Sequence, residues 1–438
     1  MERIEMSKKA KIKRIEVQNF KSFNDLKVEL GDFNVVIGPN ASGKSNFVQI
    51  FKFLKDMATS GLDNAISMQG GGEYLTNMKI RSSKEFSIKI VASGLLLRES
   101  IGDNIITGII GIVIEEAIEN VSEKRSSFRM MTLQNLTYEL TLKFKGRRGF
   151  EILAENLTCG INFKRDKKIE KGELILNRIG KKGEVRFHLP PERDIEIPKD
   201  DTLYILSFGS GNKLSPTVSF FDMPTPILTP LKEICQSIAI YDFDPKLSKK
   251  ATPITGKIEL EEDGRNLPLV LKNILERKEE KRKLSNLIQY LLPFVEDLSV
   301  EKFADKSMLF KMRESYFTDQ YLPASLISDG TINITAMIVA LFFEKKNLAI
   351  IEEPERNVHP QLISRVVNMM KDASKKKQII VTTHNPEFVK HAGLENLLLI
   401  SRDDDGFSRI TRPKEKEEVK TFLENKLGIE ELYVQNLL

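Results

Sequence analysis

A glycine-rich stretch close to the N-terminus constrains the fold of this chain more than any other feature. Residues 38–45, Gly-Pro-Asn-Ala-Ser-Gly-Lys-Ser, have the spacing G-x-x-x-x-G-K-[ST]. An apolar run at 33–37 precedes the stretch and suits a buried strand, and residues 46–54 follow it with apolar side chains at helical spacing. A strand, a glycine loop and a helix in this order predict an α/β fold in which the start of the helix faces a phosphate group.

The residue types in this loop predict a site for a nucleoside triphosphate. Glycines allow the backbone to curl so that successive N–H groups point at phosphate oxygens. Lys44 can reach the β- and γ-phosphates, and the hydroxyl group of Ser45 can ligate Mg²⁺. The predicted nucleotide-binding residues are Gly38, Pro39, Asn40, Ala41, Ser42, Gly43, Lys44, Ser45 and Asn46.

Two later apolar runs end in polar side chains that suit the same site. Residues 348–351 are a predicted buried strand followed by Glu352 and Glu353, and residues 378–383 are another, followed by His384. Ligands of open parallel sheets bind at the carboxyl ends of the strands. There one carboxylate can contact Mg²⁺, a second can orient and deprotonate a water molecule, and a histidine can hold that water or the γ-phosphate.

Two other stretches carry weaker signals. Residues 328–331, Ser-Asp-Gly-Thr, place small side chains before a helix predicted over 332–343, which indicates a second anion site. Glu355, by contrast, is predicted to cap the start of its own helix rather than to serve the nucleotide.

The composition of the 438 residues is ordinary for a globular protein, with 41% hydrophobic and 29% charged residues. A net charge of +5, from 67 basic and 62 acidic residues, permits contact with nucleic acid without arguing for it. Cys159 and Cys235 have no metal-ligand spacing and fit a reducing cytoplasm. Residues 1–13 lack the apolar segment of a signal peptide, and the most apolar stretch, 105–114, is too short to cross a bilayer. We therefore expect a cytoplasmic protein with no membrane segment, in which 105–114 is a buried strand or short helix.

The pattern along the chain predicts a single head, residues 1–438, with two lobes. The nucleotide-binding α/β lobe is expected over 11–220 and 346–410, with a mixed sheet built from residues near 11–60 and 346–410. It includes an antiparallel β-rich insertion over 84–186, where short runs of alternating apolar and polar residues dominate.

The second lobe, 225–345, is expected to be mainly helical and to carry residues 328–331, because 268–292 places apolar residues on one helical stripe. The β-rich insertion carries a basic cluster, for which two explanations stay open: solvated tips of β-hairpins, or contacts to a nucleic-acid backbone. The cluster comprises Lys164, Arg165, Lys167, Lys168, Lys171, Lys181, Lys182 and Arg186.

Taken together, the motifs resemble those of one family. GPNASGKSN, LISDGT, IIEEPERNVHP and VTTHNP occur in the order found in ABC-type ATPase heads. They look closest to the RecF/OLD-like AAA-type ATPases, relatives of the structural-maintenance-of-chromosomes (SMC) heads and of the ATPase subunits of some anti-phage systems. IKRIEVQNFKSF and EDGRNLPLVLKNIL also look like that family, so the resemblance spans nearly the whole chain. It implies the P-loop NTPase fold of an ABC-type head.

The resemblance implies a role for each motif. Lys44 and Ser45 would bind phosphate and Mg²⁺, with Glu352 at the Walker B position beside the metal. Glu353 would be the catalytic base and His384 the switch histidine. The signature loop would contact the nucleotide held by a partner subunit, and it would consist of Ser328, Asp329, Gly330 and Thr331. Ordinary ABC heads differ in having aspartate at the position of Glu352 and Ser-Gly-Gly-Gln in the signature.

The resemblance therefore implies an ATPase that forms a homodimer around ATP. It would act in DNA maintenance and repair or in anti-phage defence, with a nuclease or other effector protein as a partner and DNA as a possible ligand. A nucleotide-sensing assembly scaffold with slow hydrolysis is one alternative, and the ATPase subunit of a membrane transporter is a less favoured one. A Toprim-type nuclease module is not expected in residues 390–438, because such a module needs on the order of a hundred residues.

Overall fold

The computed structural model describes residues 10–80, 84–94, 130–146, 149–165, 168–189, 193–196, 215, 217–223, 228–303, 306–316, 320–419, 428–435 and 437. The apolar stretch at 105–114 lies outside these residues. The chain divides into two compact units. The first comprises Met1–Leu30, Ser45–Ser237 and Arg402–Arg409, and the second comprises Gly31–Lys44, Ile238–Ser401 and Ile410–Leu438.

The first unit is built mainly from strands. They are β1 (Lys11–Phe20), β2 (Phe23–Glu29), β4 (Phe86–Ser93), β5 (Met130–Lys145), β6 (Gly149–Arg165), β7 (Lys168–Ile179), β8 (Lys182–Leu189) and β9 (Arg193–Glu196). Its helices are α1 (Lys44–Ser60), α2 (Leu62–Met68), α3 (Gly72–Leu75) and α6 (Thr229–Gln236), of which α1 begins one residue before the unit boundary.

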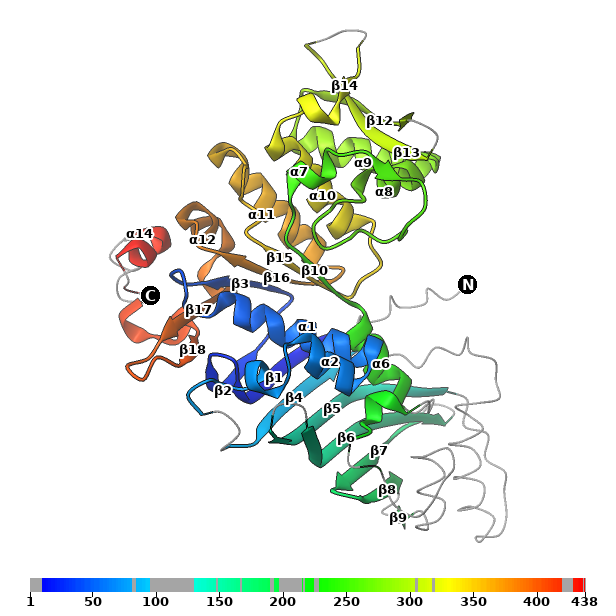
Figure 1. Ribbon diagram of the computed structural model, residues 1–438, viewed down its shortest axis with the longest axis vertical. Coiled ribbons are helices and arrows are strands. Elements are labelled where there is room, and N and C mark those ends of the chain that lie inside the picture. The colour runs from blue at the N-terminus through cyan, green and yellow to red at the C-terminus, as the bar shows by residue number, and fades with distance from the viewer. Residues whose placement is uncertain are drawn as a thin grey trace. The chain divides into compact units, whose positions relative to one another are not determined.

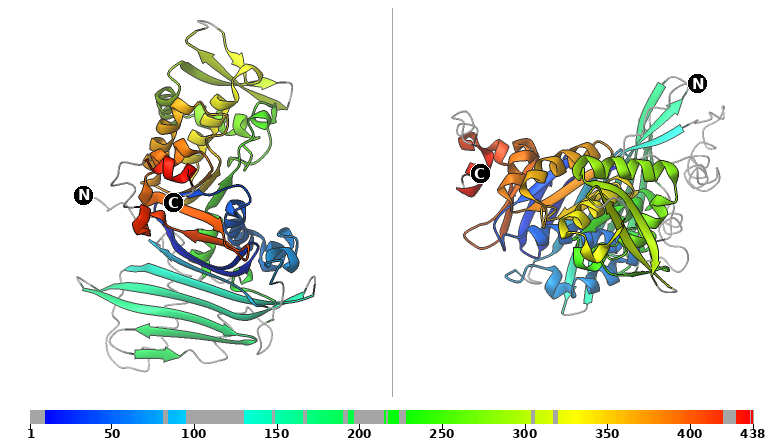
Figure 2. Two further views of the ribbon diagram at one scale, coloured as in Figure 1. Left: turned by 90° about the vertical axis from the view of Figure 1, so that its left-hand side faces the viewer. Right: turned by 90° about the horizontal axis from the view of Figure 1, so that it is seen from above.

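These strands form one antiparallel sheet in the order β2-β1-β4-β5-β6-β7-β8-β9. The left view of Figure 2 shows its strands side by side. β1 pairs antiparallel with β2 and with β4, and each later strand pairs antiparallel with the next. The predicted β-rich insertion is therefore confirmed, and it continues a sheet that begins at β1.

One face of this sheet is covered by α1, α2 and α6 (Figure 1). Phe53 of α1 packs between Phe20 of β1 and Phe86 of β4, with ring centroids 6.4 and 5.7 Å away, and all three side chains are fully buried. Burial of each such ring stabilises the fold by about 2 kcal/mol. The aromatic residues of α1 therefore attach this helix to the sheet.

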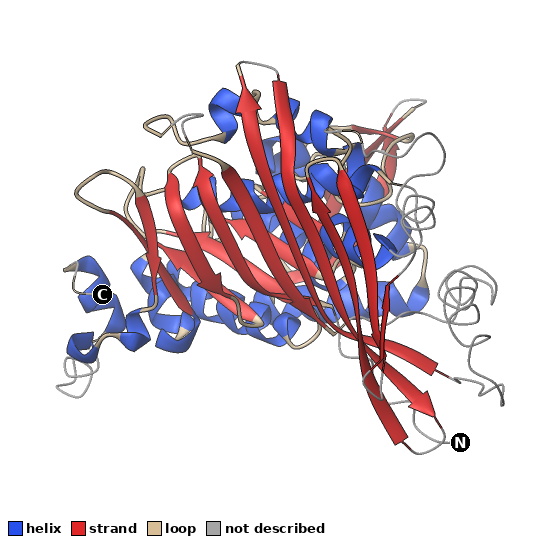
Figure 3. Cartoon of the chain, turned by 90° about the horizontal axis from the view of Figure 1, so that it is seen from below, coloured by secondary structure: helices blue, strands red, loops and turns tan. Residues whose placement is uncertain are grey.

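The opposite face of the sheet is turned to the viewer in Figure 3, and no helix of the described residues covers it. Most of its side chains are polar, as alternation along each strand predicts, although Val91 and Ile175 also lie on this face. Lys89 and Glu139, for example, form an ion pair of 3.4 Å across β4 and β5. Lys181 and Lys182 are exposed at the turn between β7 and β8, so this part of the basic cluster lies at a hairpin tip.

The second unit combines parallel strands with helices. Its strands are β3 (Phe33–Ile37), β10 (Ile238–Tyr241), β11 (Thr252–Pro253), β12 (Val295–Phe303), β13 (Ser307–Glu314), β14 (Leu322–Pro323), β15 (Leu348–Glu352), β16 (Gln378–Thr383), β17 (Leu397–Arg402) and β18 (Ser408–Thr411). The last residue of β17 and the first two of β18 fall in the first unit. Its helices are α7 (Pro245–Ser248), α8 (Leu267–Leu275), α9 (Lys278–Leu291), α10 (Asp329–Phe342), α11 (Pro360–Ser374), α12 (Pro386–Ala392) and α14 (Ile429–Val434). Across the described parts of the chain, no helix combines the length and apolar character that crossing a membrane requires.

A six-stranded sheet in the order β10-β15-β16-β3-β17-β18 forms the centre of this unit. The neighbours from β10 to β17 are parallel. Every residue of β3 and β16 is buried, as the apolar runs predict. Ile37 pairs with Thr383, and Glu352 pairs with Thr382, so that β3, β15 and β16 end at one edge of the sheet.

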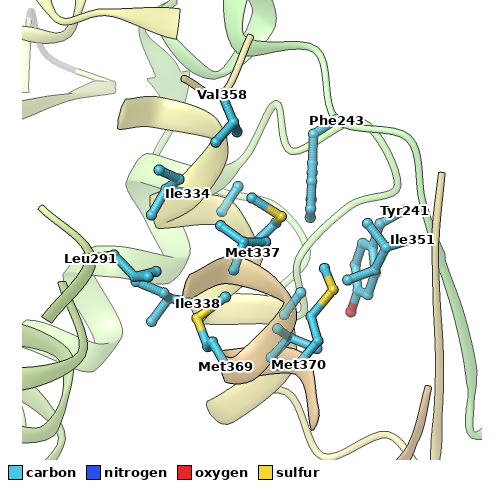
Figure 4. Packing of buried hydrophobic residues seen from close by; sticks show 14 of the residues in the cluster. Tyr241, Phe243, Leu291, Ile334, Met337, Ile338, Ile351, Val358, Met369 and Met370 are labelled. Atoms are coloured by element: carbon cyan, nitrogen blue, oxygen red, sulfur yellow. The ribbon is translucent and has the colours of Figure 1, made fainter. Parts of the chain in front are cut away.

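The hydrophobic core of this unit surrounds α10, which is buried on all sides over most of its length. Figure 4 shows Met337 and Ile338 of α10 close to Met369 and Met370 of α11, with Ile351 of β15 nearby. All five side chains are at most 4% exposed. This packing fixes α10, and with it residues 328–331, against the sheet.

Strand pairing departs from the expected mixed sheet in two respects. Residues 11–30 form β1 and β2 of the antiparallel sheet instead of joining β3, because they alternate apolar and polar side chains whereas β3 is apolar throughout. The mainly helical region 225–345 also contains strands: β10 joins the parallel sheet, and β12 and β13 form an antiparallel pair. The run Ile-Ala-Ile-Tyr of β10 is short and apolar, the pattern of a buried parallel strand.

Candidate nucleotide-binding site

The glycine loop leaves the carboxyl end of β3 and ends where α1 begins at Lys44, in the strand–loop–helix order that the sequence predicts. Gly38 has φ of +154°, and a Cβ atom there would collide with the carbonyl oxygen of Ile400 on β17. Ala41 and Gly43 also have positive φ, at +62° and +116°. Such left-handed turns let successive N–H groups point to one side, which makes a concave anion site.

Lys44 folds back over this loop. Its Nζ donates hydrogen bonds to the carbonyl oxygens of Gly38 (2.7 Å) and Pro39 (3.0 Å). Partial burial lowers the pKa of Lys44, and the negative charges of Glu353 and Glu355 oppose that shift. The hydrogen-bond acceptors of the ammonium group are thus two neutral carbonyl oxygens. Charged phosphate oxygens would bind this group more strongly than carbonyl oxygens do.

The last two predicted loop residues, Ser45 and Asn46, belong to the first unit. Ser45 follows Lys44 in the first turn of α1. Asn46 lines a cleft of about 480 Å³ within that unit, together with Lys21, Thr76 and Asn77. The cleft offers amide, hydroxyl and ammonium groups that the sequence pattern did not single out. Lys21, with φ of +46°, lies in the tight turn between β1 and β2.

Glu352 and Glu353 lie at the carboxyl end of β15. The N–H group of Glu353 continues the sheet by donating to the carbonyl oxygen of Thr382 (2.9 Å), and φ of Glu353 is +44°. Burial, and then the nearby carboxylates Asp242, Glu262 and Glu353, raise the pKa of Glu352 to about 7. Negative charge thus accumulates at this point, which favours a cation there.

Glu353 has a partner on each of its carboxylate oxygens. Nη2 of Arg356 lies 2.9 Å from Oε2, and Nδ1 of His384 lies 3.2 Å from Oε1. Partial burial alone would raise the pKa of Glu353, but the hydrogen bond and charge of Arg356, helped by His384, bring it below its usual value. The structure therefore brings together Glu353 and His384, which the sequence placed on separate strands.

Glu355 does not cap a helix, so that prediction is wrong. Helix α11 begins at Pro360 and is capped by His359, whose Nδ1 accepts the N–H of Gln361 (3.3 Å). The carboxylate of Glu355 is buried and bonds to the hydroxyl group of Thr383, with 2.5 Å between the oxygens. The tight turn after β15 is the reason, because it ends before α11 starts and leaves Glu355 beside β16.

The predicted second anion site lies at the start of α10. Ser328 caps this helix: its Oγ accepts the N–H of Thr331 (3.2 Å). Asp329 forms an ion pair with Lys249. Gly330 packs so closely that a Cβ atom would collide with the carbonyl oxygen of Asn357. The signature residues therefore contact the segment that follows Glu353 in the same unit.

Three residues of the site have no predicted role in the sequence analysis. Arg356 and Thr383 bind the carboxylates, and Tyr433 of α14 lies beside the backbone of Gly38. For Arg356 a signal existed, because it is the one lysine or arginine in the acidic run IIEEPERNVHP. Tyr433 is brought to the glycine loop because α14 packs against α12. No local sequence pattern around Tyr433 predicts this packing.

The two predicted metal-binding residues carry oxygen donors of the kind that Mg²⁺ prefers. In the second unit Glu352 supplies a carboxylate in negatively charged surroundings, and in the first unit Ser45 carries a hydroxyl group at the start of α1. Within the described ranges, no group of three or more His, Cys, Asp or Glu is placed to hold a metal ion. In nucleotide enzymes Mg²⁺ is bound through one or two protein groups, and phosphate oxygens and water complete its shell.

Comparison with known proteins gives a family, one distant relative and several solved structures of similar fold. The family described as AAA ATPase domain matches residues 11–389. An OLD nuclease of Thermus scotoductus is 22% identical over 442 residues, which cover 94% of this chain and 66% of that protein.

Solved structures of SMC heads also match. One is an Smc head bound to the C-terminal winged-helix domain of ScpA, at 15% identity and a TM-score of 0.48, covering 91% of this chain and 97% of that one. Another is an Smc head with an extended coiled coil, bound to the C-terminal domain of ScpA and derived from Pyrococcus furiosus. It has 14% identity and a TM-score of 0.47, and the match covers 95% of this chain and 99% of that one.

Proposed function

Because this chain belongs to the AAA ATPase domain family and is therefore an ATPase, we propose that its hydrolytic site lies at the carboxyl ends of β3, β15 and β16. The observation that carries the proposal is the contact between Glu353 and His384, which follow two neighbouring parallel strands. The loop that ends in Lys44 leaves the third strand, next to β16. Ligands of such sheets bind at this edge.

We assign the phosphate groups of ATP to the loop of residues 38–46. On binding, Lys44 exchanges the carbonyl oxygens of Gly38 and Pro39 for charged phosphate oxygens. Glu352 and Ser45 are the residues that would hold Mg²⁺, which when bound offsets the negative charge of the phosphates. Positive φ values at Ala41 and Gly43 already curl the loop, so its backbone N–H groups need little reorganisation.

Glu353 is the group that we assign to the attacking water. Each carboxylate oxygen has one partner and keeps a further lone pair, which can accept a proton of the water. His384 holds the carboxylate through Nδ1, and its ring is 54% exposed, so Nε2 remains free to bind the water or the γ-phosphate. The products are ADP and phosphate.

We further propose that ATP joins two copies of this chain. The loop formed by Ser328, Asp329, Gly330 and Thr331 would face the nucleotide of the partner copy. The N-terminus of α10, a helix of 14 residues, offers unpaired N–H groups and the positive end of its dipole to phosphate oxygens. The match of the motifs to ABC-type heads supports this arrangement.

For the cellular role, we propose DNA maintenance and repair or anti-phage defence, in the cytoplasm and with an effector protein such as a nuclease. The support is the relative named OLD nuclease. This chain spans 66% of the length of that relative.

Measurement of ATP turnover and ATP binding in three variants tests the site. We expect Lys44→Ala to lose ATP binding, and Glu353→Gln to keep ATP binding while turnover falls by about a hundredfold or more. Glu387→Gln, a half-exposed glutamate on α12, is the matched control and should behave as wild type. Normal turnover in Glu353→Gln would refute the assignment of the base.

Mixing of inactive variants tests the dimer. Lys44→Ala and Ser328→Arg should each lack turnover alone. A mixture should recover part of it, because a mixed dimer has one site with an intact loop and an intact signature. Absence of recovery, together with a monomeric mass of Glu353→Gln in ATP by light scattering, would refute the dimer and favour a protein that cycles alone.

A further inference from the structure

Arg356 lies between the carboxylate of Glu353 and the helix that carries the signature residues. We propose that Arg356 is a positioning residue that sets the Glu353 carboxylate according to the position of α10. The inference rests on the proposed role of Glu353 in hydrolysis. It concerns a residue that neither the loop nor the signature includes.

The guanidinium group of Arg356 bridges two carboxylates. Its Nη1 lies 2.9 Å from Oδ1 of Asp242, and its Nη2 lies 2.9 Å from Oε2 of Glu353. Asp242 directly follows β10, which lies beside β15 in the sheet. The planar fork of arginine keeps both contacts in a fixed geometry and its charge at any working pH. Glu353 is therefore held from one side by Arg356 and from the other by His384.

The main chain around Arg356 rests on α10. The carbonyl oxygen of Arg356 accepts a hydrogen bond from Nδ2 of Asn333 (2.7 Å), and Asn333 is 3% exposed. Gly330 lies against the carbonyl oxygen of Asn357, the next residue along. The N–H of Arg356 closes the turn by donating to the carbonyl oxygen of Glu353 (3.0 Å).

Side chain and main chain of Arg356 thus connect two parts of the unit. A shift at the start of α10 moves the carbonyl group of Arg356 through Asn333 and Gly330. The same shift moves the guanidinium group and changes the direction of the Glu353 carboxylate. Glu353 is then correctly directed only while the signature helix is in place, which is the state that a second nucleotide-bound copy would stabilise.

Substitution of Arg356 and Asn333, with kcat and ATP affinity measured separately, tests the inference. We expect Arg356→Ala to lower kcat by about tenfold or more, the loss typical of a hydrogen bond to a charged group, with the Kd for ATP within about twofold. Arg356→Lys should recover part of kcat, because one charged contact returns without the bridge. Arg277→Ala, which removes an exposed ion pair with Glu280, is the matched control.

Asn333→Ala tests the connection to α10. It should lower kcat in the wild-type background. It should have no further effect in Arg356→Ala, because both substitutions remove the same connection between α10 and Glu353. Additive losses, or a kcat of Arg356→Ala at or above the wild-type value, would overturn the inference. Should Asn333→Ala fail to fold, the two Arg356 variants still decide. Full turnover in Glu353→Gln would instead refute the proposed function, whereas loss in Glu353→Gln with full turnover in Arg356→Ala refutes this inference alone.

Discussion

The buried carboxylate of Glu355 accepts a hydrogen bond from the hydroxyl group of Thr383, with 2.5 Å between the two oxygens. Oγ1 of Thr383 in turn accepts the N–H of Asn385 (3.0 Å), so its own proton is directed to Glu355. His384 lies between the two residues, Thr383 and Asn385, that these hydrogen bonds involve. They fix the turn that carries this histidine to the segment that carries Glu353.

Replacement of Thr383 by valine removes both bonds while keeping the shape of the side chain. We expect lower turnover because His384 loses its fixed position, and a loss of about 1–3 kcal/mol in the free energy of unfolding because Glu355 is left buried without a donor. Steady-state hydrolysis and urea unfolding measure the two effects. Glu355→Gln, which keeps an acceptor for Thr383, should lose less stability; an equal loss would contradict this explanation.

Tyr433 should contribute to ATP affinity through the glycine loop. Tyr433→Phe removes a hydroxyl group beside the backbone of Gly38 and leaves the ring packed against the core of the second unit. We expect the Kd for ATP to rise by about twofold to tenfold, the size of effect that one neutral polar group can have, because the hydroxyl group lies beside the start of the loop. Titration calorimetry measures the change. Tyr290→Phe, at a half-exposed position on α9, is the control and should bind as wild type.

Gly330 should tolerate no side chain. In Gly330→Ala the new methyl group meets the carbonyl oxygen of Asn357, so either α10 or the turn after Glu353 must move. We expect a loss of about 1–3 kcal/mol in the free energy of unfolding together with reduced turnover. Gly256→Ala is a matched control, because a methyl group there meets a leucine side chain at an ordinary 3.7 Å. Equal behaviour of the two variants would show that the contact at Gly330 is unimportant.

A buried carboxylate in the first unit should make stability depend on pH. Oε1 of Glu155 accepts hydrogen bonds from Tyr138 (2.8 Å), Ser219 (2.6 Å) and the N–H of Phe220 (2.8 Å), and its side chain is 0% exposed. Arg178 lies 3.7 Å from Oε2. Burial nevertheless raises the pKa of Glu155 from 4.5 to about 7.

Because the folded pKa is raised, the folded state binds the proton that the unfolded state has released. Stability from this group is therefore complete below about pH 4.5 and is lost as the pH rises to about 7, by up to about 3 kcal/mol. Urea unfolding of wild type and Glu155→Gln at pH 5 and pH 8 measures it. The wild type should lose stability relative to the variant between these values, and an unchanged difference would mean that Glu155 stays ionised.

The parts of the structure that sequence predicted are those with a local signal. The glycines before Lys44 are spaced as a tight, phosphate-facing turn requires. The apolar runs that end at Glu352 and Thr383 predict neighbouring strands of a parallel sheet. Contacts between distant residues carry no such signal. Arg356 and Asp242 are 114 residues apart, and no periodicity records that they meet. The alternation along β1 distinguishes it from the apolar β3, but no local pattern identifies β4 as its partner.

The position of β3 has a consequence for biosynthesis. This strand lies between β16 and β17, and Asn34 donates a hydrogen bond to Ile379, 345 residues further along the chain. A ribosome must therefore release most of the polypeptide before the strand beneath the glycine loop gains either neighbour, which makes assembly of this sheet a late event. Until then the nascent chain lacks a formed ATP-binding site. A fragment truncated before β16 should therefore not bind ATP.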